Sequence, residues 1–410
     1  MKALVLAGGI PQAALIQELK SRGITTILAD RNPEALARPY ADKFYPVSTM
    51  DVEAVKNLAI QEQVDFLITV CADQVLLVVA KLSEELGLPC YIDYQTAKNC
   101  SDKSYMKEIF ARYEIPTAKF ITVKEINASE LAGLRYPLVV KPVDSYSSRG
   151  VRRVENFQEL QSAFADALRI GRADYAMIEE FIEGEELTVD VYVEEGRAHV
   201  LNISNSDKIA EADKFVICRT RNPAPITEVV REKVARVCQQ IADAFGLKNS
   251  PMLVQMIADD KDVSVLEFCA RTGGAIKFIL IRKACGFDVV KAVVDLTLGQ
   301  RPHVELQPSV SPLIMNDYLY CKPGIFEKLE GFEELKIEGY LADYYQFKNP
   351  GAEFTTVASS GDRVAAYTIH AQSLEDLVAK HNVVRNRVKA LDVNGEDLIR
   401  HDLIADIEWK

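Results

Sequence analysis

The first 95 residues alternate short apolar strands with amphipathic helices, and this alternation limits the folds open to the chain. Residues 3–6 and 24–29 predict two strands, with a helix between them that ends near Arg22. Residues 66–70 predict a further strand. Strands separated by helices pair in parallel, and ligands bind at the carboxyl ends of such strands. The pattern therefore predicts an α/β unit built on a parallel sheet.

The turn after the first strand gives this unit a second interpretation. The turn reads GGIPQA, and Asp30 ends the second strand, as in a dinucleotide site where an acidic residue binds a ribose. The turn lacks the GxGxxG spacing that brings backbone amides to a pyrophosphate. We therefore expect the sheet without an NAD cofactor.

Length and charge narrow the class of protein further. A chain of 410 residues is too long for one core and predicts two or three packed units. The formal net charge of −12 argues against nucleic acid or an anionic membrane surface as a partner. The best apolar stretch, residues 66–82, is interrupted by Asp73 and Gln74, so we expect no membrane span.

The eight cysteines predict a reducing compartment rather than a metal site. None forms a CxxC pair, and no histidine stands at ligand spacing from them. Scattered cysteines within apolar runs are typical of reduced thiols, so we expect a cytoplasmic protein. The N-terminal MKALVLAGGI is not followed by a small-residue cleavage site, which argues against a signal peptide.

The segment YPLVVKPVDSYSSRGV, residues 136–151, predicts a buried strand that ends in Lys141 and leads into a loop of small residues. Small side chains let backbone N–H groups approach an anion closely. Lys141 and Arg149 place positive charge at the two ends of the loop. No GxxxxGK[ST] occurs in the chain, so this is not a Walker loop. We predict a triphosphate site of another kind.

A helix is predicted just before this segment. Ser101 or Asp102 can cap it, and Lys103 then lies in its first turn, where the helix dipole favours anions. The expected apolar face consists of Met106, Ile109, Phe110 and Tyr113. Residues 176–193 read as strand, polar turn and strand, and a long helix follows over residues 230–245. After Pro308 short strands and one helix at residues 373–389 predict an α+β cap.

Residues 253–274 predict a β-hairpin around the sequence ADDKD. A register centred near Lys261 puts Gln255 opposite Glu267. Cys269 and Arg271 then share that face, because side chains two residues apart in a strand point the same way. An acid, an amide and a guanidinium together favour a hard cation that bridges phosphate oxygens. A solvated sheet face is the other interpretation.

Four motifs in order resemble one known superfamily. Lys103, then YPLVVKP with its Ser-rich loop, then EEFIEGEE, then VLEFCARTGG resemble the ATP-grasp superfamily. The chain looks closest to the carboxylate–amine ligases related to the carbamoyl-phosphate synthetase large subunit and to formate-dependent phosphoribosylglycinamide formyltransferase. The resemblance implies an ATP-grasp fold with a Rossmann-like domain at residues 1–98, an ATP-grasp domain at 99–306 whose mobile lobe is about 115–178, and a C-terminal α+β domain at 307–410.

The resemblance also implies roles for individual residues in nucleotide binding. The implied ATP contacts are Lys103, Lys141, Ser147, Ser148, Arg149, Gly150, Glu179, Glu180, Phe181, Ile182 and Glu186. Among them, main-chain groups of Glu180 and Ile182 would bind adenine, and Glu186 would hold the ribose hydroxyls. The lysines would contact the phosphates beneath a mobile loop.

Metal binding and catalysis are implied in the same way. Glu267, with Gln255, would bind magnesium, and the implied catalytic residues are Arg271, Lys141 and Arg149. The expected substrate contacts are Lys208 and Arg219, within a polar connection, and the backbone amides of Gly273 and Gly274.

Two positions depart from the family pattern. Gln255 replaces a second acidic ligand, and Cys269 stands where relatives often have an asparagine or serine. A neutral amide removes one negative charge, so we expect one magnesium ion rather than two. Thiols bind magnesium poorly, and we interpret Cys269 as a packed neighbour or substrate contact rather than a nucleophile.

The resemblance therefore implies an ADP-forming ligase that uses ATP and Mg²⁺ to join a small carboxylate to an amine through an acylphosphate. It also suggests a homodimer. Two alternatives stay open: a carbamoyl- or formyl-phosphate type of enzyme that uses bicarbonate or formate, and an ATP-binding sensor without catalysis.

Overall fold

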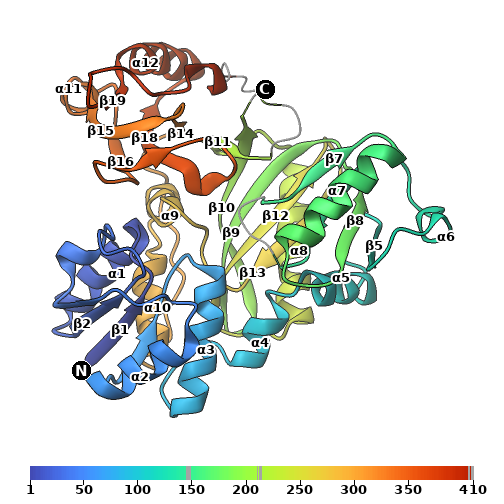
Figure 1. The fold of residues 1–410 in the computed structure, drawn as a ribbon, viewed down its shortest axis with the longest axis horizontal. Coiled ribbons are helices and arrows are strands. Elements are labelled where there is room, and N and C mark those ends of the chain that lie inside the picture. Colours follow the sequence, from blue (N-terminus) through green and yellow to red (C-terminus); the bar gives the residue numbers. More distant parts are fainter. Residues whose placement is uncertain (145–148, 210, 212–214, 405–406, 408–410) are drawn as a thin grey trace.

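The computed structural model describes residues 1–144, 149–209, 211, 215–404 and 407. The predicted nucleotide contacts Ser147 and Ser148 lie outside this described part. Among the described residues, no helix has both the length and the apolar character needed to cross a membrane. The described residues form four sheets, and Figure 1 shows an N-terminal part at the lower left, a C-terminal part at the upper left and a third part at the right, with strands of the large sheet between them.

The N-terminal part is a parallel sheet covered by helices on both faces, as predicted. Its strand order is β3-β2-β1-β4, and every pairing is parallel. The strands are β1 (Lys2–Leu6), β2 (Thr25–Ala29), β3 (Lys43–Tyr45) and β4 (Phe66–Ile68). The helices are α1 (Ile10–Ser21), α2 (Val52–Glu62) and α3 (Asp73–Leu86). Residues of α1 pack on one face, and residues of α2 and α3 pack on the other.

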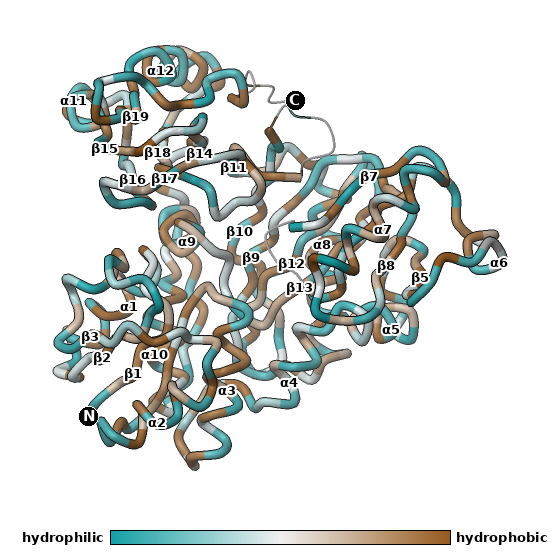
Figure 2. The backbone as a smooth tube through the Cα atoms, in the orientation of Figure 1, coloured by the Kyte–Doolittle hydropathy of each residue, from teal (hydrophilic) through white to brown (hydrophobic). Residues whose placement is uncertain are grey.

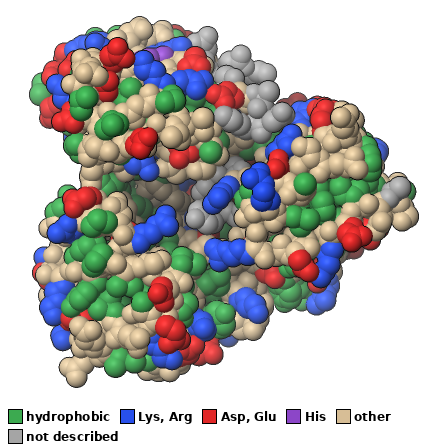
Figure 3. Space-filling view, viewed as in Figure 1, with side chains coloured by type: hydrophobic (Ala, Val, Ile, Leu, Met, Phe, Trp, Pro, Cys, Tyr) green, Lys and Arg blue, Asp and Glu red, His purple; other side chains and the backbone are tan. Residues whose placement is uncertain are grey.

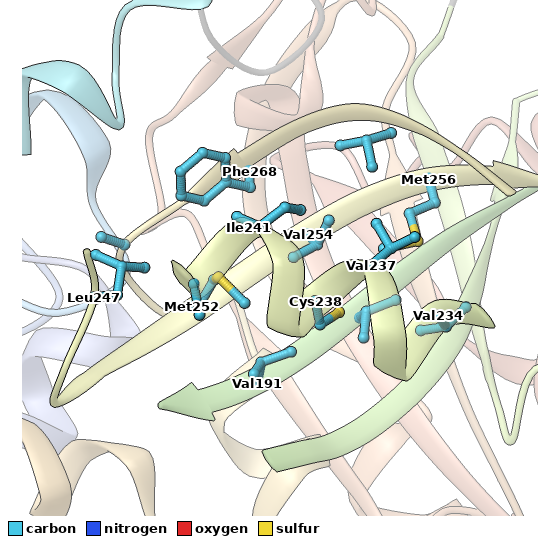
Figure 4. Close-up of a cluster of buried hydrophobic side chains, with 14 of the residues drawn as sticks. Val191, Val234, Val237, Cys238, Ile241, Leu247, Met252, Val254, Met256 and Phe268 are labelled. Carbon is cyan, nitrogen blue, oxygen red and sulfur yellow. The ribbon is translucent and has the colours of Figure 1, made fainter. Parts of the chain in front are cut away.

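The large sheet has eight strands in the order β13-β12-β9-β10-β11-β14-β18-β16, and all its pairings are antiparallel. Its strands are β9 (Glu185–Glu194), β10 (Arg197–Lys208), β11 (Ile217–Asn222), β12 (Ser250–Ala258), β13 (Val263–Cys269), β14 (Leu313–Tyr320), β16 (Asp343–Gln346) and β18 (Arg363–Ala371). Helix α8 (Glu228–Ala244) packs on one face, with the predicted Val234, Val237 and Ile241 in the core shown in Figure 4.

The small sheet has the order β5-β8-β6-β7 and forms the part at the right of Figure 1. Its strands are β5 (Phe120–Val123), β6 (Leu138–Pro142), β7 (Arg152–Val154) and β8 (Ala176–Glu180). Helix α7 (Phe157–Ile170) closes it through Leu160 and Phe164, and α6 (Ala128–Leu131) lies in the preceding connection. This separate core gives the small sheet a compact body of its own.

The C-terminal part continues the large sheet instead of standing apart from it. Strand β14 pairs with β11, so the sheet runs across the domain boundary expected near residue 307. A three-stranded sheet, β17-β15-β19, completes this part. Its elements are β15 (Gly324–Glu330), α11 (Phe332–Ile337), β17 (Glu353–Phe354), α12 (Leu374–Arg387) and β19 (Lys389–Asp392). The predicted helix is α12, capped by Ser373.

Four helices join the parts. They are α4 (Tyr94–Asn99), α5 (Lys103–Arg112), α9 (Lys277–Cys285) and α10 (Val289–Thr297). Helix α10 packs beside α1 of the N-terminal part, and its hydrophobic sequence colours it largely brown in Figure 2. Helix α5 turns Met106, Ile109 and Phe110 into the core as predicted, whereas Tyr113 is half exposed and was wrongly placed on that face.

Candidate functional site

The first lysine of the site stands at the start of α5. Asp102 caps this helix by accepting from the backbone N–H groups of Ser104 and Tyr105 at 3.0 and 3.1 Å, as predicted. The Nζ atom of Lys103 lies 3.1 Å from Glu267 Oε2. Burial alone would lower the pKa of Lys103, but the attraction of Glu267 outweighs it and raises that pKa. Lys103 is therefore held charged beside the predicted metal ligand.

The hairpin has the predicted register, since Gln255 pairs with Glu267 across β12 and β13. Gln255 Nε2 lies 3.4 Å from Glu186 Oε1 on the neighbouring strand β9. Lys208 Nζ of β10 lies 2.6 Å from the same Glu186 oxygen. Four adjoining strands thus present an amide, two carboxylates and an ammonium on one face of the large sheet.

A buried carboxylate connects the small sheet to α5. Glu179 Oε1 accepts from Lys141 Nζ at 2.5 Å, and Glu179 Oε2 lies 3.0 Å from Lys107 Nζ. The three side chains are 4%, 8% and 1% exposed. Burial would raise the pKa of Glu179, but Lys141 and Lys107 outweigh it and lower that pKa to about 2. Glu179 therefore acts through its side chain as the counterion of two lysines, which the sequence did not indicate.

Main-chain hydrogen bonds hold the end of β8 and the residue that follows it. The Glu180 N–H donates to the Lys119 carbonyl at 2.9 Å, and the Phe181 N–H donates to the Pro137 carbonyl at 2.9 Å. Within the described part of the chain, the Glu180 carbonyl and the Ile182 N–H have no hydrogen-bond partner. These are the two groups predicted to bind adenine, and they suit a base that offers one donor and one acceptor.

Glu180, Phe181 and Gly150 of the predicted hinge and loop have local contacts of their own. The Glu180 carboxylate accepts from the backbone N–H of Arg135 at 3.1 Å, and Arg153 lies 4.3 Å from the centre of the Phe181 ring. Gly150 has a φ of 78°, and a Cβ there would lie 2.9 Å from the Pro142 side chain. A side chain at this end of the loop would therefore be strained.

Arg271 joins the large sheet to the N-terminal part. Its Nε and Nη2 atoms both donate to the carboxylate of Asp73, the first residue of α3. Burial raises the pKa of the neighbouring Cys269 thiol well above its usual value. A protonated thiol agrees with the interpretation of Cys269 as a neighbour rather than a nucleophile.

The loop after Arg271 leads to a buried polar row. A Cβ on Gly273 would lie 3.0 Å from Lys277 Cγ, whereas one on Gly274 would meet only the Cys71 carbonyl oxygen, at 3.8 Å. Lys277 Nζ donates to Ser204 Oγ at 2.5 Å and lies 4.0 Å from Asp190 Oδ2. The backbone of Gly274 is therefore approachable, and that of Gly273 is covered on one side.

The structure corrects the expected location of two predicted substrate contacts. Lys208 and Arg219 lie in strands β10 and β11, not in a polar connection over the site. Arg219 is 1% exposed, and its Nε donates to Asp317 Oδ1 at 2.6 Å on the far side of the sheet from Glu186. The buried ion pair of Arg219 and Asp317 joins β11 to β14, so we withdraw Arg219 as a substrate contact. Lys208 instead pairs with Glu186 on the site face of the sheet.

The donor set fits magnesium only in part. No group of three His, Cys, Asp or Glu side chains that could hold a metal is found among the described residues. Glu267 and the amide oxygen of Gln255 supply the oxygen ligands that magnesium prefers. Magnesium in phosphate-transfer sites takes one or two protein ligands and the rest from phosphate and water. The pair therefore fits one metal ion that arrives with a nucleotide.

Two members of the charged cluster were missed as ion-pair partners by sequence reasoning, Lys107 and Asp73. Lys107 lies one helical turn after Lys103 on α5, which places both on one face. Asp73 begins α3, at the end of the short connection that follows the carboxyl end of β4, where ligands gather in parallel sheets. The helical spacing of Lys107 and the place of Asp73 after a parallel strand were the sequence signals that could have identified them.

The charged groups form neighbouring ion pairs. One runs from Lys141 through Glu179 to Lys107, and Lys103, one turn earlier on α5, pairs with Glu267 of β13, whose charge also acts on Lys107. Burial would raise the pKa of Asp73, but Arg271 outweighs it and lowers that pKa, with Lys103 contributing from nearby. Figure 3 shows a hollow where the three parts meet, with Lys and Arg side chains at its edge.

Relatives of known sequence are ligases and synthases. The chain is 27% identical over 359 residues to the 3-methyl-D-ornithine–L-lysine ligase of Methanosarcina mazei, covering 86% of each chain. It is 26% identical over 273 residues to the ligase of that name from Methanosarcina barkeri, covering 66% of this chain and 67% of that one. It is 23% identical to the mitochondrial carbamoyl-phosphate synthase [ammonia] of Aquarana catesbeiana over 76% of this chain, which spans 21% of that synthase.

Solved structures share the fold. The L-amino acid ligase from Bacillus licheniformis superposes with a TM-score of 0.80 at 21% identity, covering 95% of this chain and 98% of that one. The phosphoribosylglycinamide synthetase from Anaerococcus prevotii superposes with a TM-score of 0.73 at 20% identity, covering 95% and 99%. At these identities the likeness concerns the fold.

Family models match both halves of the candidate site. An ATP-grasp N-terminal domain matches residues 17–90, and an ATP-grasp domain matches residues 134–278, which include Lys141, Glu179 and Glu267. The predicted resemblance is thus confirmed: the chain belongs to the ATP-grasp superfamily.

Proposed function

We propose that this protein is an ATP-dependent, ADP-forming ligase that joins a carboxylate to an amine through an acylphosphate. One observation supports this most: Lys103, Lys141, Glu267 and Arg271 come from separate segments, and their ion pairs lie close enough for the charges of one pair to act on the next. Such a cluster suits phosphoryl transfer, where the protein contributes alignment and charge compensation rather than covalent chemistry.

ATP would lie between the small and the large sheets. Its adenine would bind the Glu180 carbonyl and the Ile182 N–H, which have no partner among the described residues. Its ribose hydroxyls would bind Glu186, and its phosphates would form ion pairs with the ammonium groups of Lys103 and Lys141. Arg149 and Gly150 would close over the phosphates from the small sheet.

One magnesium ion would be held by Glu267 and Gln255 together with phosphate oxygens, and it would offset the phosphate charge when bound. Glu267 lies 3.1 Å from Lys103, which would contact the phosphates. A metal ion on Glu267 would therefore also lie close to the phosphates. A second acidic ligand is replaced by Gln255, which is consistent with one ion.

The reaction would proceed in two steps. A carboxylate oxygen attacks the γ-phosphorus of ATP, the bond to ADP breaks, and an acylphosphate forms. The amine nitrogen then attacks the acyl carbon, the carbon–oxygen bond to phosphate breaks, and the nitrogen loses a proton. Arg271 would offset the charge on the transferring phosphoryl group, and the approachable backbone of Gly274, with Gly273, would face the acyl group.

We further propose amino acids as the carboxylate and the amine. The support comes from relatives named as a 3-methyl-D-ornithine–L-lysine ligase and an L-amino acid ligase. A bicarbonate- or formate-using enzyme is the second candidate, favoured by the 23% identity to a carbamoyl-phosphate synthase over 76% of this chain. The homodimer and the expected domain boundaries stay predictions.

The test is a matrix of amino acids, other small acids and amines incubated with MgATP, read as release of ADP and phosphate. The proposal predicts release only when a carboxylate and an amine are both present. With an ¹⁸O-labelled carboxylate, one label should pass to the released phosphate. ADP release with bicarbonate or formate alone would favour the second candidate, and ATP binding without release under any condition would favour the sensor.

A further inference from the structure

A second lysine of α5 is built into the cluster although no motif points to it. Lys107 is 1% exposed, and its Nζ lies 3.0 Å from Glu179 Oε2. That oxygen accepts no hydrogen bond within the described residues, so Lys107 and Glu179 attract each other as charges and not through a hydrogen bond. The other Glu179 oxygen accepts a hydrogen bond from Lys141 at 2.5 Å. Two ammonium groups thus share one buried carboxylate.

Neighbouring groups fix the position of Lys107. Its Nζ donates to Thr117 Oγ1 at 2.5 Å, and Thr117 Oγ1 donates to the Val265 carbonyl at 2.7 Å. Since the hydroxyl gives its one proton to Val265, it can only accept from Lys107. Val265 lies on β13, two residues before Glu267. The ammonium is therefore anchored to the large sheet while it faces Glu179 of the small sheet.

This arrangement bears on the charge of Lys141. A single carboxylate beside a single ammonium would cancel the charge of Lys141 where a phosphate needs it. Lys107 faces the same carboxylate from the other side and offsets its charge. The cluster of two ammonium groups and one carboxylate keeps a net positive charge, and Lys141 is its member on β6.

We propose that Lys107 is a positioning residue for nucleotide binding: it compensates Glu179, so that the Lys141 ammonium stays available to the phosphates of ATP. The inference rests on the proposed function and names a residue outside the expected site. The geometry supports it, because Lys107 is 1% exposed and its Nζ lies 3.0 Å from Glu179 Oε2. Removal of one charge from such a buried group leaves its partner uncompensated.

The experiment is calorimetric titration of MgATP into three variants, Lys107→Met, Lys141→Met and the double variant. Lys107→Met should weaken ATP binding about tenfold, the scale of one charge-assisted hydrogen bond. On the Lys141→Met background the same change should cost less than about twofold, since Lys107 acts through Lys141. Lys124→Met is the matched control, because Lys124 pairs with Asp174 at the surface of the same small sheet at 2.6 Å.

A suppressor keeps the test decisive if Lys107→Met alone folds poorly. The double variant Lys107→Met with Glu179→Gln removes both charges of the buried pair, so it should fold and bind ATP within about threefold of the wild type. Wild-type affinity in folded Lys107→Met, equal losses on both Lys141 backgrounds, or no recovery in the suppressor would each overturn the inference. Failure of the wild type itself to bind ATP would instead overturn the proposed function.

Discussion

The large and the small sheets face the same cleft but hold their charged groups differently. On the large sheet, the Glu267 side chain is 32% exposed and pairs with a lysine from a helix. On the small sheet, Glu179 is 4% exposed and lies beneath Lys141. The large sheet rests on α8 and a core that extends to α5, whereas the small sheet has its own core, built mainly on α7 among the described residues. The site therefore has a side on the large sheet, which carries Glu267 and Arg271 and is called the fixed side, and a side on the small sheet, which carries Lys141 and is called the cationic side.

The largest expected effect tests the fixed side. Arg271→Ala should lower turnover on the order of 10²- to 10³-fold while ATP affinity changes only a few fold, because Arg271 would act on the transferring group. Steady-state kinetics and calorimetry measure the two quantities. Since the substitution leaves Asp73 without its partner, Arg271→Ala with Asp73→Asn is the matched variant. Retention of most turnover in both would remove Arg271 from the mechanism.

On the cationic side, a substitution should lower ATP affinity itself. Lys141→Met removes the ammonium expected on the phosphates, and we expect ATP affinity to fall about 10- to 100-fold. Glu179 keeps Lys107 as a partner in this variant, so the fold should persist. Calorimetry gives the affinity, and the melting temperature is the control. An unchanged affinity would place the phosphates elsewhere.

Core substitutions sharpen the contrast between the two bodies. Ile241→Ala on α8 and Leu160→Ala on α7 both empty fully buried positions and should each cost about 2–5 kcal/mol locally. Ile241→Ala should lower the global free energy of unfolding. Leu160→Ala should instead speed amide hydrogen exchange mainly in residues 120–178, because the small sheet has a core of its own. Equal exchange throughout the chain would contradict two separate bodies.

Acid should act on the small sheet through Glu179. Lys141 and Lys107 outweigh burial and lower the folded-state pKa to about 2, below the usual value of about 4.3 in an unfolded chain. The contribution is therefore present above about pH 4.3 and is lost as pH falls toward about 2. Glu179→Gln should make the free energy of unfolding, from urea titrations at several pH values, less dependent on pH in this window. An unchanged slope would show that Glu179 is not the titrating group.

The smallest effect belongs to a surface pair of the same small sheet. Lys124 and Asp174 are 69% and 72% exposed, and solvent screens such pairs. Lys124→Met should leave the melting temperature and ATP affinity unchanged. A measurable loss of affinity would mean that any lysine near this sheet attracts ATP, which would remove the distinction drawn for Lys107 and Lys141.

Much of the fold followed from local patterns. The parallel N-terminal sheet is confirmed, because strand–helix alternation leaves few other topologies. The pairing of Gln255 with Glu267 is confirmed, because the polar ADDKD turn fixes the centre of a hairpin. The continuation of the large sheet through β14 was missed, since strand pairing between distant segments leaves no periodic signal in either one.

The partners of the charged residues were the part that sequence could not supply. Lys107 has the spacing of a solvated helix face, and only the approach of β8 shows that it is buried. Arg219 was misplaced because a run of polar residues suggested a loop, whereas its buried partner Asp317 lies 98 residues later. Ion pairs between remote segments depend on tertiary packing, and a single sequence does not record it.

The most direct measurement of the central claim is a crystal structure with Mg²⁺ and a non-hydrolysable ATP analogue. We expect the triphosphate within hydrogen-bond distance of Lys103 and Lys141, the adenine on the Glu180 carbonyl and Ile182 N–H, and the metal on Glu267. A nucleotide bound outside this cleft, or one in the cleft whose phosphates contact neither lysine, would contradict the account.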